Sequence, residues 1–183
     1  MKNFINIKDI PASDLRKIIS DAKRRKKKRK NLNALDLDKN SPLKGKLLIQ
    51  MFEKSSLRTR LSFYLAIKQL GGGVLTLRPN ELHLRKGGES LADTAKILST
   101  FGNAFMLRTD DDAKLEEFKN HLNIPIINGL TNLSHPCQIM SDIMTFEELK
   151  GPIKNKKIAW LGDGNNIVHS LIEAAAQFDF ELC

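Results

Sequence analysis

The chain has 183 residues, of which 41% are hydrophobic, and this suits one globular domain, or one domain and part of another. Its formal net charge of +9 comes almost entirely from one run, Lys23 to Lys30, whose eight positive charges leave only +1 for the rest of the chain. No apolar run approaches the roughly 18 residues of a membrane span, and the first residues lack the apolar core of a signal peptide, so we expect no membrane partner.

The basic run favours a solvated helix end and linker over a nucleic-acid interface. A nucleic-acid interface spreads positive charge over a domain and interleaves it with aromatic residues. Here the charge is local, and neither the one Trp nor the one Tyr lies near it in the sequence. We therefore expect no nucleic-acid partner, and an RNA-binding α/β protein is an alternative that rests on this run alone.

Hydrophobic periodicity predicts strands that alternate with helices. The first predicted helix opens at Ser13, taken as its N-cap, and runs into the basic run, and a polar connection follows over residues 31–42. The later elements are expected at these places: strand Leu47–Phe52, helix Leu61–Leu70, strand Val74–Leu77, loop 78–89, a helix from Ser90, strand Ala104–Arg108, helix Lys114–Leu122, strand Ile124–Asn128, helix Ser134–Leu149, strand Lys156–Leu161, a helix ending at Gln177, and the start of a strand over 178–183. This order predicts an α/β fold, a parallel sheet flanked by helices.

The segment Phe52–Arg60, FEKSSLRTR, lies where a predicted strand is followed by a helix. The hydroxyls of Ser56 and Thr59 can cap the helix, whose free N–H groups and dipole favour an anion. Arg58 and Arg60 add planar donors that fit phosphate or carboxylate oxygens. These residues favour a phosphate cradle, and the alternative is a capping serine with solvated arginines on the first turn.

Two further polar features stand at predicted strand ends. Arg108 closes an apolar strand, and the segment His135-Pro136-Cys137-Gln138 opens a helix after another strand. In parallel sheets ligands bind at the carboxyl ends of the strands, so both features can face the same ligand as the cradle. A neutral His can polarise a carbonyl and a Gln three residues later can bind an amide. An arginine that reaches solvent and a simple helix-start turn are the alternatives.

We expect no metal and no cofactor. The four histidines show no metal-ligand spacing, and Cys137 has no second thiol nearby. A Walker sequence is absent, and Gly162-Asp163-Gly164 lacks the third glycine of a dinucleotide fingerprint. The two cysteines, Cys137 and Cys183, give no disulfide framework, which favours a cytoplasmic protein.

Together, FEKSSLRTR, MLRT, HPCQ and LGDGNN resemble the carbamoyltransferase family, and within it the members that use ornithine, over nearly the whole chain. The resemblance implies transfer of a carbamoyl group from carbamoyl phosphate to the δ-amine of L-ornithine, giving citrulline and phosphate in arginine biosynthesis. It also implies a carbamoyl phosphate-binding domain over residues 1–150, the first βα unit of an incomplete ornithine-binding α/β domain over 151–183, and a homotrimer built through the first domain.

The resemblance also implies a role for each matching residue. Arg108, His135 and Gln138 are the implied catalytic residues. The residues implied to bind carbamoyl phosphate are Ser56, Leu57, Arg58, Thr59, His83, Arg108, His135 and Gln138, and His83 would act in a neighbouring subunit's site. Asn166 is implied to bind ornithine. Leu57 stands where the family has Thr, so one hydroxyl is lost there, although the backbone N–H can still donate.

The chain ends before the Ser-Met-Gly and HCLP segments that the family's second domain carries, and Cys183 is not in an HCLP context. We therefore expect a C-terminally truncated polypeptide. The alternative to an active enzyme is an inactive or split remnant that binds carbamoyl phosphate or phosphate without turnover.

Overall fold

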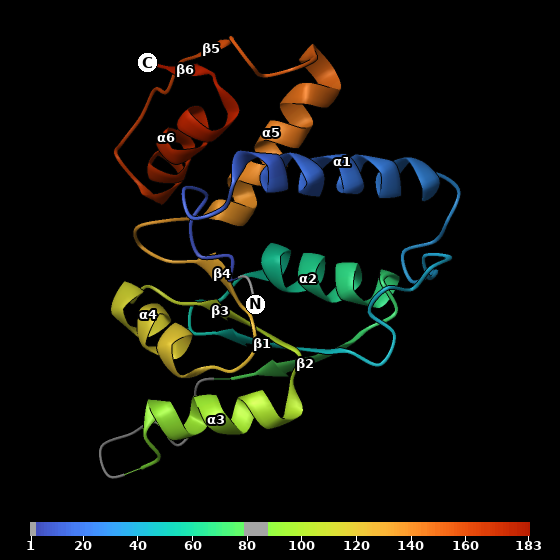
Figure 1. The fold of residues 1–183 in the computed structure, drawn as a ribbon, viewed down its shortest axis with the longest axis vertical. Coiled ribbons are helices and arrows are strands. Elements are labelled where there is room, and N and C mark those ends of the chain that lie inside the picture. Colours follow the sequence, from blue (N-terminus) through green and yellow to red (C-terminus); the bar gives the residue numbers. More distant parts are fainter. Residues whose placement is uncertain (1–2, 79–87) are drawn as a thin grey trace.

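Four parallel strands form the central sheet of the computed structural model, which describes residues 3–78 and 88–183 (Figure 1). The strands are β1 (Leu47–Phe52), β2 (Gly73–Leu77), β3 (Ala104–Arg108) and β4 (Ile126–Leu130), and their order is β2-β1-β3-β4. The chain runs outward from β1 to β2 and then returns to β3 beside β1. The carboxyl ends of β1 and β3 therefore flank the switch point of the sheet, where α/β folds bind their ligands.

Helices cover both faces of this sheet, which confirms the predicted α/β fold. The helices are α1 (Ala12–Lys28), α2 (Leu57–Gln69), α3 (Leu91–Phe101), α4 (Asp112–His121), α5 (Pro136–Lys150) and α6 (Asn166–Phe178). Figure 1 shows α3 and α4 on one face and α2 on the other, with α1 crossing α5 above α2. Within residues 3–78 and 88–183, no helix combines the length and the apolar character that crossing a bilayer requires.

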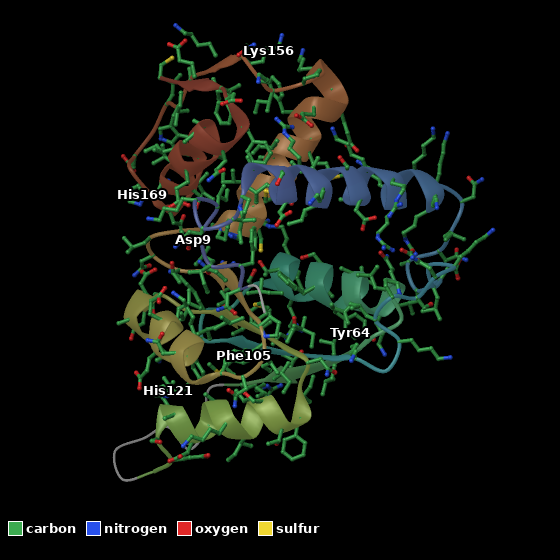
Figure 2. All side chains as sticks on the ribbon, in the orientation of Figure 1. Asp9, Tyr64, Phe105, His121, Lys156 and His169 are labelled. Atoms are coloured by element: carbon green, nitrogen blue, oxygen red, sulfur yellow. The ribbon has the colours of Figure 1, made fainter. Side chains whose placement is uncertain are left out.

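One hydrophobic core lies between the sheet and helices α3 and α4. Alternate residues of β1 and β3 point into it, including Met51 and Phe105, and both are fully buried. The Phe105 ring packs against Phe118 of α4 with 5.1 Å between ring centroids, and Figure 2 labels Phe105 in this position on the sheet. Because strand side chains alternate between faces, the intervening Arg108 and Gln50 point to the α2 face.

A second core joins α1, α5 and α6. Leu15 and Ile19 of α1 pack with Ile139 of α5 and with Phe178 at the end of α6. Past α5, two strands of two residues each, β5 (Lys157–Ile158) and β6 (Glu181–Leu182), pair in parallel as a separate small sheet. Residues on both sides of the expected division after residue 150 therefore share one core, and the division itself stays a prediction.

Three helices begin earlier than the sequence predicts, and one of them is α4, which begins at Asp112 and not at Lys114. The expected N-cap at Ser13 is wrong, because the Pro11 carbonyl already accepts from Asp14 N (2.9 Å) and Leu15 N (3.1 Å), and Pro11 is the N-cap of α1. Helix α2 begins at Leu57 and not at Leu61, since Ser56 caps it. The arginines of the FEKSSLRTR segment consequently lie on a helical turn and not in a loop.

Other boundaries move by small amounts. The fourth strand spans Ile126–Leu130 and not residues 124–128, because Pro125 has no N–H to donate to a ladder. The fifth strand is limited to Lys157–Ile158, where β6 is its partner in the described part of the chain. The predicted loop 78–89 falls largely on residues 79–87, outside the described residues.

The basic run forms the end of α1, and ion pairs use much of its charge. Five of its eight residues have acidic partners, as follows: Lys23 with Glu147, Arg24 with Asp21, Arg25 with Asp21 and Asp38, Lys26 with Glu148, and Arg29 with Asp38. These pairs connect α1 to the connection after it and to the end of α5. The ion pairs give the run a local structural role, and the expectation of no nucleic-acid partner stays a prediction.

Glu147 is the most enclosed carboxylate of this network, and we predict that Glu147→Ala lowers the free energy of unfolding by about 3 kcal/mol. Its side chain, 8% exposed, accepts from Arg16, from Lys23 Nζ (2.8 Å) and from Ile153 N (3.3 Å). The substitution leaves these three donors without their acceptor. Urea denaturation at pH 7 measures the change.

Glu148→Ala is the matched control, because its partner Lys26 is 64% exposed and such a pair contributes less than about 1 kcal/mol. Burial opposes ionisation of Glu147, but its donors outweigh burial and hold its pKa below the ordinary value. The stability that Glu147 contributes is therefore present above the ordinary carboxyl pKa and lost as pH falls through the lowered one. Equal losses in the two variants would contradict this account.

Candidate active site

The amino end of α2 forms one wall of the candidate site. Ser56 caps the helix: its Oγ accepts from Thr59 N (3.3 Å) and donates to Thr59 Oγ1 (2.9 Å). The capping role expected for Ser56 is thereby confirmed. Leu57 and Arg58 occupy the first turn, whose N–H groups have no acceptor within a helix and attract an anion.

Arg108, the last residue of β3, meets this helix end. It lies beside Phe52 in the β1–β3 ladder, and its Nη1 donates to Thr59 Oγ1 (3.1 Å) and to Gly129 O (3.3 Å). Its Nε is buried and has no protein acceptor among the described residues. Burial, and then the like charge of Arg58, lower the pKa of Arg108. The two guanidinium groups repel each other, and an anion that accepts hydrogen bonds from both would relieve this repulsion.

A bulge in β4 aims the Gly129 carbonyl at Arg108. Leu107 pairs with Asn128 and Arg108 pairs with Leu130, so Gly129 is the extra residue. A Cβ at position 129 would lie 2.4 Å from Met106 Sδ and 3.2 Å from Leu107 O, so the close approach requires glycine. The next residue, Leu130, has φ +144°, a region that favours glycine. Sequence reasoning missed this feature, and the available signal was a glycine within an apolar strand pattern.

His135 enters from the neighbouring strand end as the N-cap of α5. It is 9% exposed, its backbone N donates to Ser170 Oγ of α6 (2.8 Å), and Pro136 supplies the first helical residue. Its Nδ1 is buried and has no partner in the part of the chain that the structure describes. Burial, and then the charge of Arg108, lower the pKa of His135 to about 4. The imidazole is therefore neutral at pH 7 and close enough to Arg108 to feel its charge.

Two predicted site residues, Gln138 and Asn166, have their amide groups in other contacts, and a third lies outside the described residues. Gln138 lies on the exposed side of α5, where its Nε2 donates to Asp142 Oδ1 (2.8 Å). Asn166 opens α6 and its Nδ2 donates to Thr131 O (2.7 Å), which places it against the loop before His135. His83 lies outside the described residues. The roles expected for all three stay predictions.

A cavity of about 1030 Å³ adjoins the cradle on the β2 side of α2. It shares Ser56 and Leu57 with the cradle, and Arg60, Leu61 and Tyr64 extend it along α2. The Leu57 side chain is 66% exposed. An apolar group at this position therefore faces solvent, and it leaves the contact between Thr59 and Arg108 intact.

No group of three or more His, Cys, Asp or Glu side chains within residues 3–78 and 88–183 could hold a metal ion. Figure 2 shows His121 on α4 and His169 on α6, on separate elements. The chemistry that the cluster offers is therefore hydrogen bonding and positive charge from Ser56, Thr59, Arg58, Arg108 and His135. Such a set binds a phosphoryl group and stabilises negative charge on a carbonyl oxygen.

Comparison with known proteins identifies close relatives. Residues 2–148 match the family model described as "Aspartate/ornithine carbamoyltransferase, carbamoyl-P binding domain". An ornithine carbamoyltransferase of Brucella ovis is 47% identical over 182 residues, which are 100% of this chain and 56% of the relative. The chain thus spans little more than half the length of the curated relatives that it matches.

Solved structures show the same fold. An ornithine carbamoyltransferase from Pyrococcus furiosus superposes with a TM-score of 0.91 at 38% identity, over 99% of this chain and 56% of that one. The ornithine carbamoyltransferase from Burkholderia thailandensis gives 0.89 at 36% identity, over 100% of this chain and 61% of that one.

We predict that His135 stays neutral down to about pH 5 and titrates near pH 4, because burial and Arg108 both oppose its protonation. Nitrogen-15 NMR of the imidazole, assigned with His135→Asn, measures this directly. Between the ordinary pKa of 6.5 and about 4 the unfolded chain binds the proton more readily, so this residue lowers stability as pH falls through that window.

Arg108→Ala is the informative variant for this titration. Removing the guanidinium removes one of the two causes, so the pKa of His135 rises from about 4 toward its ordinary value without reaching it. A midpoint near 6.5 in the unsubstituted protein would contradict the placement of His135.

Proposed function

Because the chain belongs to the aspartate/ornithine carbamoyltransferase family, we propose that it takes part in carbamoyl transfer from carbamoyl phosphate to the δ-amine of L-ornithine, giving citrulline and phosphate. The observation that carries the proposal is the meeting of Arg108, Thr59 and Arg58 at the amino end of α2, beside a buried neutral His135. The names of the relatives, ornithine carbamoyltransferase, support ornithine as the acceptor. Arginine biosynthesis is the setting that we propose on the family resemblance.

In the proposed complex, the phosphate of carbamoyl phosphate lies at the amino end of α2. Ser56, Thr59 and Arg58 donate to its oxygens together with the backbone N–H groups of the first turn, including that of Leu57. Arg108 bridges the phosphate and the carbamoyl oxygen. Two observations support this role: its Nη1 donates to Thr59 at the cradle, and its buried Nε has no acceptor among the described residues.

The deprotonated δ-amine of ornithine attacks the carbonyl carbon, and the carbonyl oxygen gains negative charge. Arg108 and neutral His135 donate to that oxygen, which stabilises the tetrahedral intermediate. The carbon–oxygen bond to phosphate then breaks, phosphate leaves with the electron pair, and the amine nitrogen loses its second proton to give citrulline. The proposed reaction proceeds by positioning and electrostatics, with no metal or cofactor.

The remaining assignments are proposals on the family pattern. Gln138 accepts from the carbamoyl NH2 group, Asn166 binds the α-amino acid part of ornithine, and His83 acts in a neighbouring subunit's site. Residues 1–150 form the domain that holds carbamoyl phosphate, which the match to residues 2–148 supports, and residues 151–183 begin the ornithine-binding domain. We place the protein in the cytoplasm.

We also propose that the protein is a homotrimer through its first domain. The supporting observation is helix α2, which has no buried residue. Leu61 is 47% exposed and Tyr64 is 38% exposed, and their spacing of three residues places both on one face of the helix. Apolar side chains gathered on one face in this way are typical of a protein–protein contact.

A second candidate is a chain that binds carbamoyl phosphate or phosphate without turnover. Its support is the cradle itself, since Ser56, Thr59 and Arg58 can hold a phosphate whether or not an amine is carbamoylated. A citrulline assay on residues 1–183 distinguishes the two: citrulline above background excludes the second candidate, and binding without citrulline excludes turnover by these residues alone.

We predict that inorganic phosphate binds the chain and that Arg58→Ala weakens this binding about 10- to 100-fold, the loss expected when one charge-assisted contact is removed. Isothermal titration calorimetry measures the affinity. Arg24→Ala is the matched control, since Arg24 pairs with Asp21 on the α1 surface and lies outside the cradle. Similar affinities for the two variants would overturn the cradle.

We predict that the chain elutes as a trimer and that Leu61→Asp converts it to monomers, because a carboxylate would be buried without a partner. Size-exclusion chromatography with light scattering gives the mass. Ile97→Asp is the control, since Ile97 on α3 is 49% exposed, nearly the same as Leu61. A monomeric unsubstituted chain, or equal dissociation by both variants, would count against the α2 interface.

A further inference from the structure

Glu53 directly follows β1, and it forms hydrogen bonds with the end of β3 through both its backbone and its side chain. Its backbone N donates to Arg108 O (2.9 Å), which extends the β1–β3 pairing by one bond. Its carboxylate Oε2 accepts from Thr109 Oγ1 (2.6 Å). One residue therefore holds the carbonyl of Arg108 and the side chain of the next residue along β3.

Thr109 is fully buried, and its other hydrogen bonds connect the end of β3 to β4 and to the turn before α4. Its backbone N donates to Leu130 O (3.1 Å), and its Oγ1 accepts from Asp111 N (3.1 Å). The Arg108–Thr109 peptide is consequently held by β1 on one side and by β4 on the other. The hydroxyl of Thr109 joins Glu53 to the turn that starts α4.

Lys114 of α4 completes the arrangement by neutralising Glu53. Lys114 Nζ lies 2.8 Å from Glu53 Oε1, and the side chains are 31% and 17% exposed. The carboxylate is thus occupied by one cation and one hydroxyl, both on the β3–α4 side. Glu53 lies next to the phosphate cradle, but its carboxylate binds Lys114 and Thr109. It therefore does not neutralise Arg58 or Arg108, whose positive charge stays available to an anion.

We infer that Glu53 and Thr109 are positioning residues, which fix the direction in which Arg108 leaves the sheet and so place its guanidinium between Thr59 and Gly129. The inference rests on the proposed phosphate site. Arg108 is the last residue of its strand and lies opposite a bulge. Past it, the backbone bonds from Glu53 to Arg108 and from Thr109 to Leu130 hold the chain, and the side-chain bond between Thr109 and Glu53 restricts it further. A tilt of about 10° there displaces the end of an arginine by about 1 Å, an error that costs a site on the order of 100-fold.

The test compares Thr109→Val, which removes the hydroxyl at nearly constant volume, with Thr109→Ser, which retains it. Two quantities are measured on the 183-residue chain: the affinity for inorganic phosphate by calorimetry, and the NMR signal of the Arg108 Nε–H group, identified by its loss in Arg108→Lys. Thr109→Val is expected to weaken phosphate binding about 10-fold or more and to shift or broaden the Arg108 signal. Thr109→Ser is expected to stay within about 2-fold of the unsubstituted chain, with its Arg108 signal in place.

Glu53→Gln supplies a second variant should the valine variant fail to fold. Thr109 and Lys114 donate to different oxygens of Glu53, and the substitution replaces one of these oxygens with an NH2 group that cannot accept. It is expected to change both quantities in the same direction. Glu116→Gln is its matched control: Glu116 is another carboxylate paired with a lysine of α4, Lys119, without contact to β3. It should change neither quantity.

An unchanged Arg108 signal in Thr109→Val, or equal phosphate affinities for the valine and serine variants, would overturn the inference. Failure of the unsubstituted chain to bind phosphate would overturn the proposed function instead. In that case the Arg108 signal of the ligand-free protein still decides whether Glu53 and Thr109 position it.

Discussion

The hydrogen bond from Arg108 to Thr59 is the contact on which the site depends, because it joins the end of β3 to the amino end of α2. The strand order places these two ends side by side at the switch point of the sheet. Arg108 is partly buried there and lies near Arg58, so its charge is unfavourable in the protein alone. The fold holds it in place with neutral oxygens from Thr59 and Gly129, which leave that charge available to an anion.

The two clusters of positive charge, the basic run on α1 and the arginines at the amino end of α2 and the end of β3, differ in their acidic partners. On α1 the basic run is paired with acidic side chains, and Glu147 and Asp38 each accept from two cations. At the amino end of α2 and the end of β3, Glu53 is turned to Lys114 and Thr109. The net charge therefore draws attention to the end of α1, where most cations are paired. The partners of each cation show that the amino end of α2 is the surface better suited to bind an anion.

Sequence patterns predict the strands that lie in the middle of the sheet most accurately. The bounds of β1 and β3 match their apolar runs, because both are buried on two faces, and the charged Glu53 follows β1 while Arg108 ends β3. The capping role of Ser56 also follows from sequence, since it depends on a contact within four residues. The association of Arg108, Thr59 and His135 at one edge was predictable from the alternation of strands and helices, and the roles proposed for them rest on the family resemblance.

Features that depend on packing between distant segments were not predictable in this way. The bulge at Gly129 depends on Met106 and Leu107 of the neighbouring strand, and the start of α2 at Leu57 depends on a cap whose strength the sequence alone does not give. Likewise, helical spacing shows that Gln138 and His135 lie on one side of α5, but it does not predict that the Gln138 amide binds Asp142. Pairing of Glu53 with Lys114 spans 61 residues and has no signature in either segment.

The most direct test of the central claim is a crystal structure of the chain grown with inorganic phosphate. The account predicts one phosphate at the amino end of α2, within hydrogen-bond distance of Ser56 or Thr59, Arg58 and the Nε of Arg108. A phosphate bound instead among Lys27, Lys28 and Lys30 at the end of α1, with none at α2, would contradict it.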